Sequence, residues 1–132
     1  MKKVVTKGET MVRETFEGSL WFNSSKDTMR HKLEESDQNS GVGISIGKNS
    51  HLFSYRKAYV GLLFDDDSKG QALVKKHSLN NCPHLIQECI GNWARKNGLW
   101  KLKLSQRNVP VKLKVVQDYE DFLCVKISHI DQ

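Results

Sequence analysis

The sequence predicts an α+β fold in which a bent antiparallel sheet packs against one main amphipathic helix. Short apolar segments alternate with polar residues and are separated by polar turns, and one stretch at about 83–96 has helical spacing. A minor surface helix is expected at about 25–35. The 132 residues fit one domain, with 1–40 as a possible N-terminal arm before the main body. Two small sheets joined near residue 80 are an alternative arrangement.

The N-terminal part is predicted to contain one strand and the minor helix. Apolar residues between 10 and 22 indicate a strand or hairpin arm, which Gly18 interrupts. Ser24 and Ser25 are suitable N-caps for the helix at 25–35. Its apolar side contains only Met29 and Leu33, so it must lie on the surface. The polar stretch at 36–43 is the expected boundary between arm and body.

Two hairpins are predicted in the middle of the chain. Alternating residues from 42 to 46, a turn at 47–50 and a return at 51–55 indicate the first. The second combines an apolar strand at 59–64 with a returning segment at 71–75. The acidic sequence between them is favoured as a polar turn over a site for a divalent cation.

The helix at 83–96 has the clearest signals for its ends. Pro83 suits the first helical position, and the Asn97-Gly98 pair is a stop signal. Between them, apolar residues recur along one face, which is expected to pack on the sheet. These residues are Leu85, Ile86, Cys89, Ile90, Trp93 and Ala94.

The C-terminal third is predicted to be a three-stranded meander, with strands at 99–104, 109–116 and 122–127. Alternate residues of a strand share one face of a sheet. Leucine, valine and isoleucine would then form the buried face of the meander. The opposite face would be a ladder of lysines: Lys101, Lys103, Lys112, Lys114 and Lys126.

The register of the ladder depends on where the two turns lie. A turn at Arg107-Asn108 would place Lys103 opposite Lys112, and a turn near residue 120 would place Lys114 beside Lys126. Like charges that face each other in a sheet are destabilising, and a bound anion offsets that repulsion. A solvated face that keeps the sheet soluble is the alternative interpretation.

The charge distribution also favours an anionic partner. The net charge is +6, and residues 1–40 contribute none of it because they carry seven basic and seven acidic side chains. Nucleic acid, bound non-enzymatically through backbone phosphates, is therefore the leading hypothesis, as for a small regulator or accessory factor of phage or plasmid type. Further candidate contacts are Lys48, Tyr55, Arg56 and Lys57.

Two other functions stay open. One is a protein-interaction module, such as an inhibitor or adaptor, that engages an acidic protein surface. The other is a small nuclease built from lysine, histidine and aspartate. The sequence lacks a phosphate-binding P-loop and a nucleophile elbow, so an enzyme is the weaker expectation.

No metal or cofactor is expected. His77, Cys82, His84 and Cys89 are zinc-ligand types, but their spacing does not match the usual pairs of close ligands. The three cysteines are an odd number, which favours free thiols and an intracellular, cytoplasmic protein. An apolar segment long enough for a signal peptide or a membrane span is also missing.

Overall fold

The computed structural model describes residues 15–46, 59–75, 84–119 and 122–130. This part of the chain forms seven strands and three helices, which confirms the α+β class. In chain order they are β2 (Thr15–Phe22), α2 (Lys26–Glu35), β3 (Val42–Ser45), β4 (Tyr59–Phe64), β5 (Lys69–Lys75), β6 (His84–Ile86), α3 (Glu88–Lys96), α4 (Leu99–Ser105), β7 (Pro110–Tyr119) and β8 (Phe122–His129).

The strands form a closed barrel in the order β2-β3-β6-β5-β4-β8-β7, and β7 pairs with β2 to complete the ring. The alternative of two separate sheets is therefore wrong. Neighbouring strands are antiparallel except for β4 and β8, which are parallel. The expected bent sheet thus curls until its edges meet, which leaves no open edge in the ring. Residues 15–22, assigned to the expected arm, are one strand of this wall.

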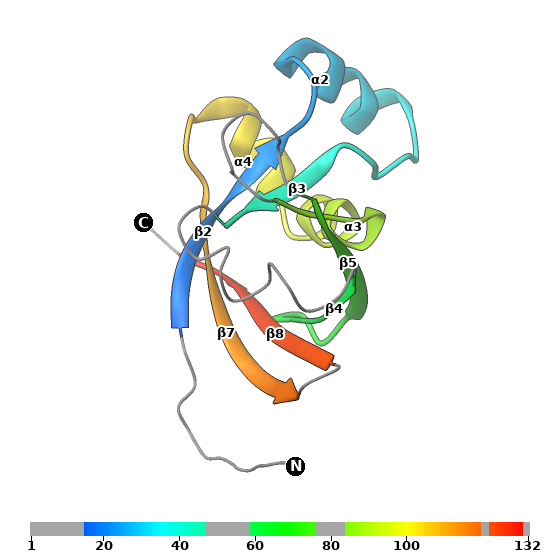
Figure 1. The fold of residues 1–132 in the computed structure, drawn as a ribbon. Coiled ribbons are helices and arrows are strands. Elements are labelled where there is room, and N and C mark those ends of the chain that lie inside the picture. Colours follow the sequence, from blue (N-terminus) through cyan, green and yellow to red (C-terminus); the bar gives the residue numbers. More distant parts are fainter. Residues whose placement is uncertain (1–14, 47–58, 76–83, 120–121, 131–132) are drawn as a thin grey trace.

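The helices lie together at one end of the barrel (Figure 1). Helix α3 contacts β3 and β5, and α4 contacts both α2 and α3. None of the helices in the described part of the chain is long and apolar enough to cross a membrane.

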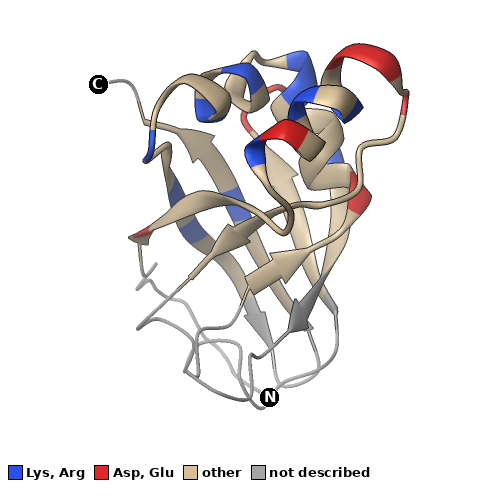
Figure 2. Ribbon diagram, turned by 90° about the horizontal axis from the view of Figure 1, so that it is seen from above, with Lys and Arg blue, Asp and Glu red and all other residues tan. Residues whose placement is uncertain are grey.

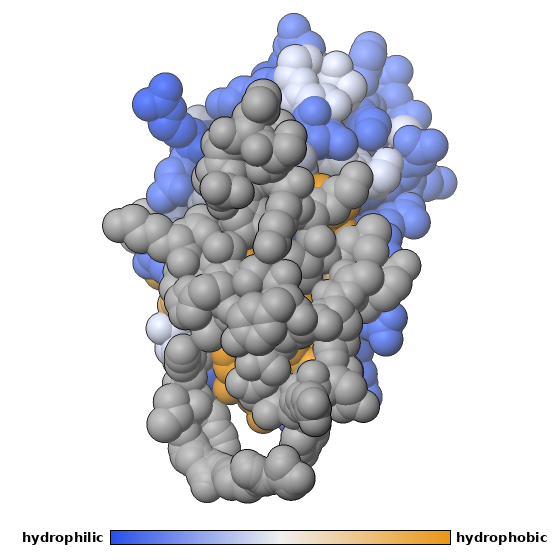
Figure 3. Space-filling view, in the orientation of Figure 1, coloured by the Kyte–Doolittle hydropathy of each residue, from blue (hydrophilic) through white to orange (hydrophobic). Residues whose placement is uncertain are grey.

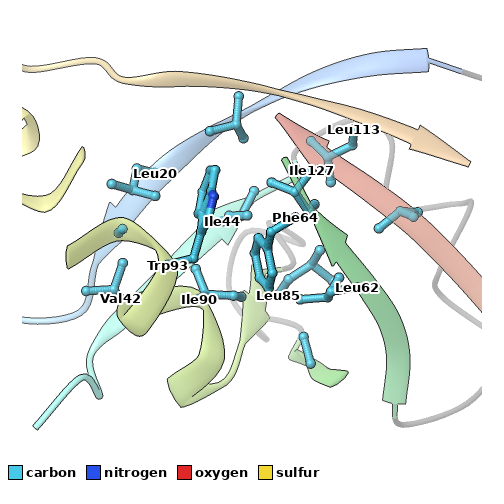
Figure 4. Packing of buried hydrophobic residues seen from close by; sticks show 14 of the residues in the cluster. Leu20, Val42, Ile44, Leu62, Phe64, Leu85, Ile90, Trp93, Leu113 and Ile127 are labelled. Atoms are coloured by element: carbon cyan, nitrogen blue, oxygen red, sulfur yellow. The ribbon is translucent and has the colours of Figure 1, made fainter. Parts of the chain in front are cut away.

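The apolar core fills the barrel and continues into the helical end. Alternate residues of the strands point inward, among them Leu20, Ile44 and Leu113. Trp93 of α3 inserts its indole between the barrel and the helices and stacks on Phe64 with ring centroids 5.0 Å apart. Figure 4 shows this ring surrounded by side chains from several strands.

The main helix begins later than the sequence indicates. Residues 84–86 form strand β6, which pairs with β3 and with β5 and so fills the gap between them. Helix α3 starts at Glu88, with the Gln87 side chain accepting a hydrogen bond from the Glu88 amide. Leu85 is buried as a residue of strand β6, whereas Ile90 and Trp93 are buried as residues of the helix, as expected. Pairing with two neighbours outweighs the helical spacing of the first residues.

The first strand of the expected meander is wrong, because residues 99–105 form helix α4. Gly98 adopts a left-handed φ of 75°, which ends α3 and turns the chain directly into α4. Leu99 and Leu102 lie three residues apart, and Trp100 and Leu104 four apart, so this short segment fits both periods. The helix buries Leu99 and Trp100 fully.

The minor helix is confirmed as α2, from Lys26 to Glu35. The Ser25 side chain caps it by accepting a hydrogen bond from the Thr28 amide. Met29 is its buried residue, and the Met29 carbonyl accepts a hydrogen bond of 3.2 Å from the Trp100 indole. The polar stretch after α2 leads directly into β3.

The second hairpin is also confirmed, with β4 and β5 joined through the acidic turn. The return segment expected for the first hairpin, at 51–55, lies outside the described residues. Both edges of β3 are already paired, with β2 and with β6.

The acidic turn contains Asp66, whose carboxylate accepts several hydrogen bonds. Ser68 donates both its hydroxyl and its amide to Asp66, and Asn97 donates to the other carboxylate oxygen at 3.0 Å. The Ser68 hydroxyl is the main cause that lowers the pKa of Asp66 to about 2, against an opposing desolvation and with help from Asn97 and Lys96. A depressed pKa contributes stability above the unfolded value of 3.8, and this is lost as the pH falls towards 2.

We expect Asp66→Asn to be less stable than the parent at neutral pH and to approach it as the pH falls from about 4 to about 2. Urea unfolding at several pH values measures this convergence. A constant gap across that window would contradict the assignment of the titration to Asp66.

Candidate nucleic-acid interface

The outer face of β7 and β8 carries three lysines, Lys112, Lys114 and Lys126, which are called the basic wall from here on. All three are exposed, whereas their strand neighbours Leu113 and Val125 are completely buried. The alternation predicted for these two strands is therefore confirmed. It arises because lysines alternate with aliphatic residues along each strand, so that the lysines point outward while the aliphatic side chains point into the barrel.

Lys114 and Lys126 are direct partners across the β7–β8 pair, as the predicted register requires. Opposed Cα atoms of an antiparallel pair lie about 4.5–5.5 Å apart, so the two ammonium groups share a small volume of solvent. Among the described residues, no acidic side chain forms a salt bridge with any of the three wall lysines. The wall is thus a local concentration of positive charge.

The row through Lys114 and Lys126 crosses five strands. Thr15 of β2 lies on one side of Lys114, and Leu63 of β4 lies beside Lys126. Leu63 in turn is paired with Lys69, which is exposed at the start of β5. This row contains three lysines and no acidic residue. It is the most basic line of side chains on the described barrel wall.

The neighbouring row contains one acid. Glu17 of β2 is the direct partner of Lys112, and Ser128 lies on the other side. The prediction that Lys103 lies opposite Lys112 is wrong, because β2 occupies that edge of β7. The sequence has no local signal for this pairing, since β2 and β7 are separated by most of the chain.

Lys101 and Lys103 lie on helix α4 instead of on the sheet. Lys101 is exposed, and Lys103 donates a hydrogen bond from its ammonium to the carbonyl of Arg107. Desolvation, together with the nearby charges of Lys26 and Arg107, lowers the pKa of Lys103. Lys26, Lys103 and Arg107 therefore form a second basic group, and Arg107 lies shortly before the start of β7.

Charge is distributed differently on the two parts of the molecule. In Figure 2 the helical end carries acidic and basic positions together, whereas blue positions fall on neighbouring strands of the wall. The surface of the helical end is largely hydrophilic (Figure 3). On α2 and α3, two basic residues have acidic partners: Arg30 pairs with Asp27 at 3.0 Å and Lys96 with Asp66 at 3.9 Å. Among the described residues, the three wall lysines have no such acidic partner within salt-bridge distance.

The remaining candidate contacts, Lys48, Tyr55, Arg56 and Lys57, lie outside the described residues. So do His77 and Cys82 of the metal-ligand hypothesis. His84 is buried on β6, and the Cys89 thiol donates to the Gln71 carbonyl. The described residues contain no group of three or more metal-ligating side chains.

The acidic turn is a structural element, as favoured from the sequence. One carboxylate oxygen of Asp65 accepts from the Trp93 indole at 2.8 Å, and the other accepts from the His129 amide at 3.0 Å. Asp66 is bound to Ser68 and Asn97. These carboxylates connect the turn to α3 and β8.

Comparison with known proteins gives no relative for this chain: no protein-family model, curated protein or solved structure matches it.

Proposed function

We propose that this protein binds nucleic acid without catalysing its cleavage, and that the basic wall contacts backbone phosphates. The observation that carries the proposal is the row through Lys114, Lys126 and Lys69, which has two directly opposed lysines and no acid. Such a row is unfavourable for the isolated fold and favourable beside a chain of phosphates.

The basic group at Lys26, Lys103 and Arg107 supports a longer contact. Arg107 lies three residues before Pro110, the first residue of β7, so this group lies near the start of the strand that carries Lys112 and Lys114. A phosphate backbone that follows β7 would meet the wall first and this group next. Cations spaced along one strand suit a polymer of phosphates better than a single small anion.

The test compares two double variants with the same loss of charge. Lys114→Gln/Lys126→Gln removes the opposed pair of the wall. Arg30→Gln/Lys96→Gln removes two cations that already have acidic partners on the helices. Fluorescence anisotropy with labelled single strands, duplex DNA and RNA at several salt concentrations measures the affinity of each protein.

We expect the wall variant to weaken binding to all these ligands and to reduce the salt slope by about one to two units. The helical variant should stay close to the parent. The wall variant should also be as stable as the parent or slightly more stable, because an opposed like-charge pair is gone. Thermal melts run in parallel check this.

A third variant changes the wall in the opposite direction. Glu17→Gln removes the acid opposite Lys112, so it should tighten binding. Equal weakening by both double variants would show that only net charge matters and would overturn the proposal. Wall-dependent binding of polyglutamate without binding of nucleic acid would instead identify an acidic protein as the partner.

A further inference from the structure

Trp21 stands apart from the other two tryptophans of the chain. Trp93 and Trp100 are 1% and 0% exposed, whereas Trp21 is only partly buried. It has the same strand parity as Glu17 and Ser19, while Leu20 points into the barrel. The indole therefore lies on the outer side of β2, on the same wall as the strand partners of Lys112 and Lys114. Burial in the core does not explain its position.

Two neighbours hold the ring against the sheet. Gly43 of β3 is the direct partner of Trp21, and a Cβ atom on Gly43 would lie 3.1 Å from the indole Cε3. The indole thus occupies the space above β3 that a side chain would need. On the next strand, the His84 ring is 4.0 Å from the Trp21 ring, measured between centroids, with planes tilted by 41°. The ring is fixed across three strands.

The line from the basic wall to Trp21 follows β2. Thr15 and Glu17 are paired with Lys114 and Lys112, and Trp21 lies four residues further along the same strand. At about 3.3 Å per residue this is roughly 13 Å, a distance that a short stretch of extended single strand spans. Between Glu17 and Trp21, the outer face of β2 carries only Ser19, so no acidic side chain lies between them on this strand.

We infer that Trp21, held by Gly43 and His84, is a stacking platform for an unpaired base, so that the protein prefers single-stranded nucleic acid. The inference rests on the proposed function, because the lysines supply the phosphate contacts that bring the strand to the ring. Lysines alone attract phosphates of any strandedness. A base stacks on an aromatic face only when it is free of its own neighbours, and every base has such a face.

The decisive probe is a pair of strands of equal length and charge, an oligothymidylate and a deoxyribose-phosphate strand without bases. Stacking contributes about 1–3 kcal/mol per base, which corresponds to roughly 5- to 150-fold in affinity. We expect the parent to bind the oligothymidylate at least about fivefold more tightly than the base-free strand. Trp21→Ala should remove this preference and leave binding of the base-free strand unchanged.

Trp21→Phe keeps an aromatic face and guards against a loss of folding in the alanine variant. It should retain part of the preference for bases. Because the other tryptophans are buried, quenching by iodide should report mainly Trp21 in the parent. Bound oligothymidylate should protect Trp21 from iodide, and the base-free strand should not.

The outcomes separate this inference from the proposed function. Equal affinity for the two strands, with both still sensitive to Lys114→Gln/Lys126→Gln, would overturn the stacking platform and leave the phosphate contact standing. Tighter binding of duplex than of single strand would likewise overturn the platform. If neither the oligothymidylate nor the base-free strand bound, both proposals would be overturned.

Discussion

Trp93→Ala should lower the free energy of unfolding by about 3–5 kcal/mol, the usual cost of truncating a large core aromatic. The indole is 1% exposed and stacks on Phe64, so its removal leaves a cavity where α3 meets the barrel. The variant also removes the donor that binds Asp65 at 2.8 Å. Urea unfolding, with the slope compared to confirm two-state behaviour, measures the change.

Trp93→Phe is the matched control for this prediction. It keeps a ring against Phe64 but lacks the indole N–H, so Asp65 retains only the His129 amide among these two donors. We expect a smaller loss, about 1–3 kcal/mol, from the missing hydrogen bond and the smaller ring. An alanine variant as stable as the parent would mean that α3 does not close the barrel core.

The sequence is informative where strand partners are close along the chain. The β4–β5 pair is joined by a turn of polar residues, and β7 is joined to β8 by a two-residue link. Both pairs and the alternation of the wall lysines were predicted correctly, because the polar turn and the period of two are local properties. The capped helix α2 is local in the same sense.

Contacts between segments that are distant in the sequence determine the remaining strand pairs and the two short elements that were predicted wrongly. The parallel pair of β4 with β8 and the pairing of β2 with β7 close the barrel, yet neither has a signature in its own residues. Residues 84–86 and 99–105 show the same limit, since each short segment fits both helical and strand spacing. Partner strands decide for β6, and the left-handed Gly98 together with burial of Trp100 decides for α4.

The candidate site likewise combines residues that were found from the sequence with residues that only the strand pairing reveals. Lys112, Lys114 and Lys126 were found from alternation alone, whereas Lys69 joins their row only through the β4–β8 pair. Glu17 enters through the β2–β7 pair. From the sequence alone Trp21 looks like a core residue, because a tryptophan in an apolar strand is usually buried. Its outward parity becomes visible only when Leu20 is known to face the core.

Arg95 is the residue whose role is least visible in the sequence. Its place in the last turn of α3 suggests an interaction with the dipole of its own helix. In the structure the guanidinium instead reaches α2, where it donates to the carbonyls of Leu33 at 2.7 Å and Lys32 at 3.0 Å. It also donates to the Gln38 carbonyl and the Asn39 amide oxygen. The last carbonyls of a helix lack partners within it, so Arg95 caps α2 from outside.

Arg95→Ala should therefore destabilise the protein by about 3 kcal/mol, because hydrogen bonds from a charged donor contribute about 1.5–3 kcal/mol each and this one is partly exposed. The variant also loses the cation that lies 4.8 Å from the centre of the Trp100 ring. Arg95→Lys should recover little of the loss, since an ammonium cannot donate along four fixed directions.

Lys96→Ala is the control, because this exposed neighbour has only a 3.9 Å ion pair with Asp66 and should change stability by less than about 1 kcal/mol. Amide hydrogen exchange distinguishes the capping role from a general loss of packing. In Arg95→Ala the amides of α2 should lose more protection than those of β7 and β8, because the cap acts on that helix. Uniform loss of protection across helix and barrel would contradict a capping role, and unchanged exchange in α2 would show that its carbonyls need no external donor.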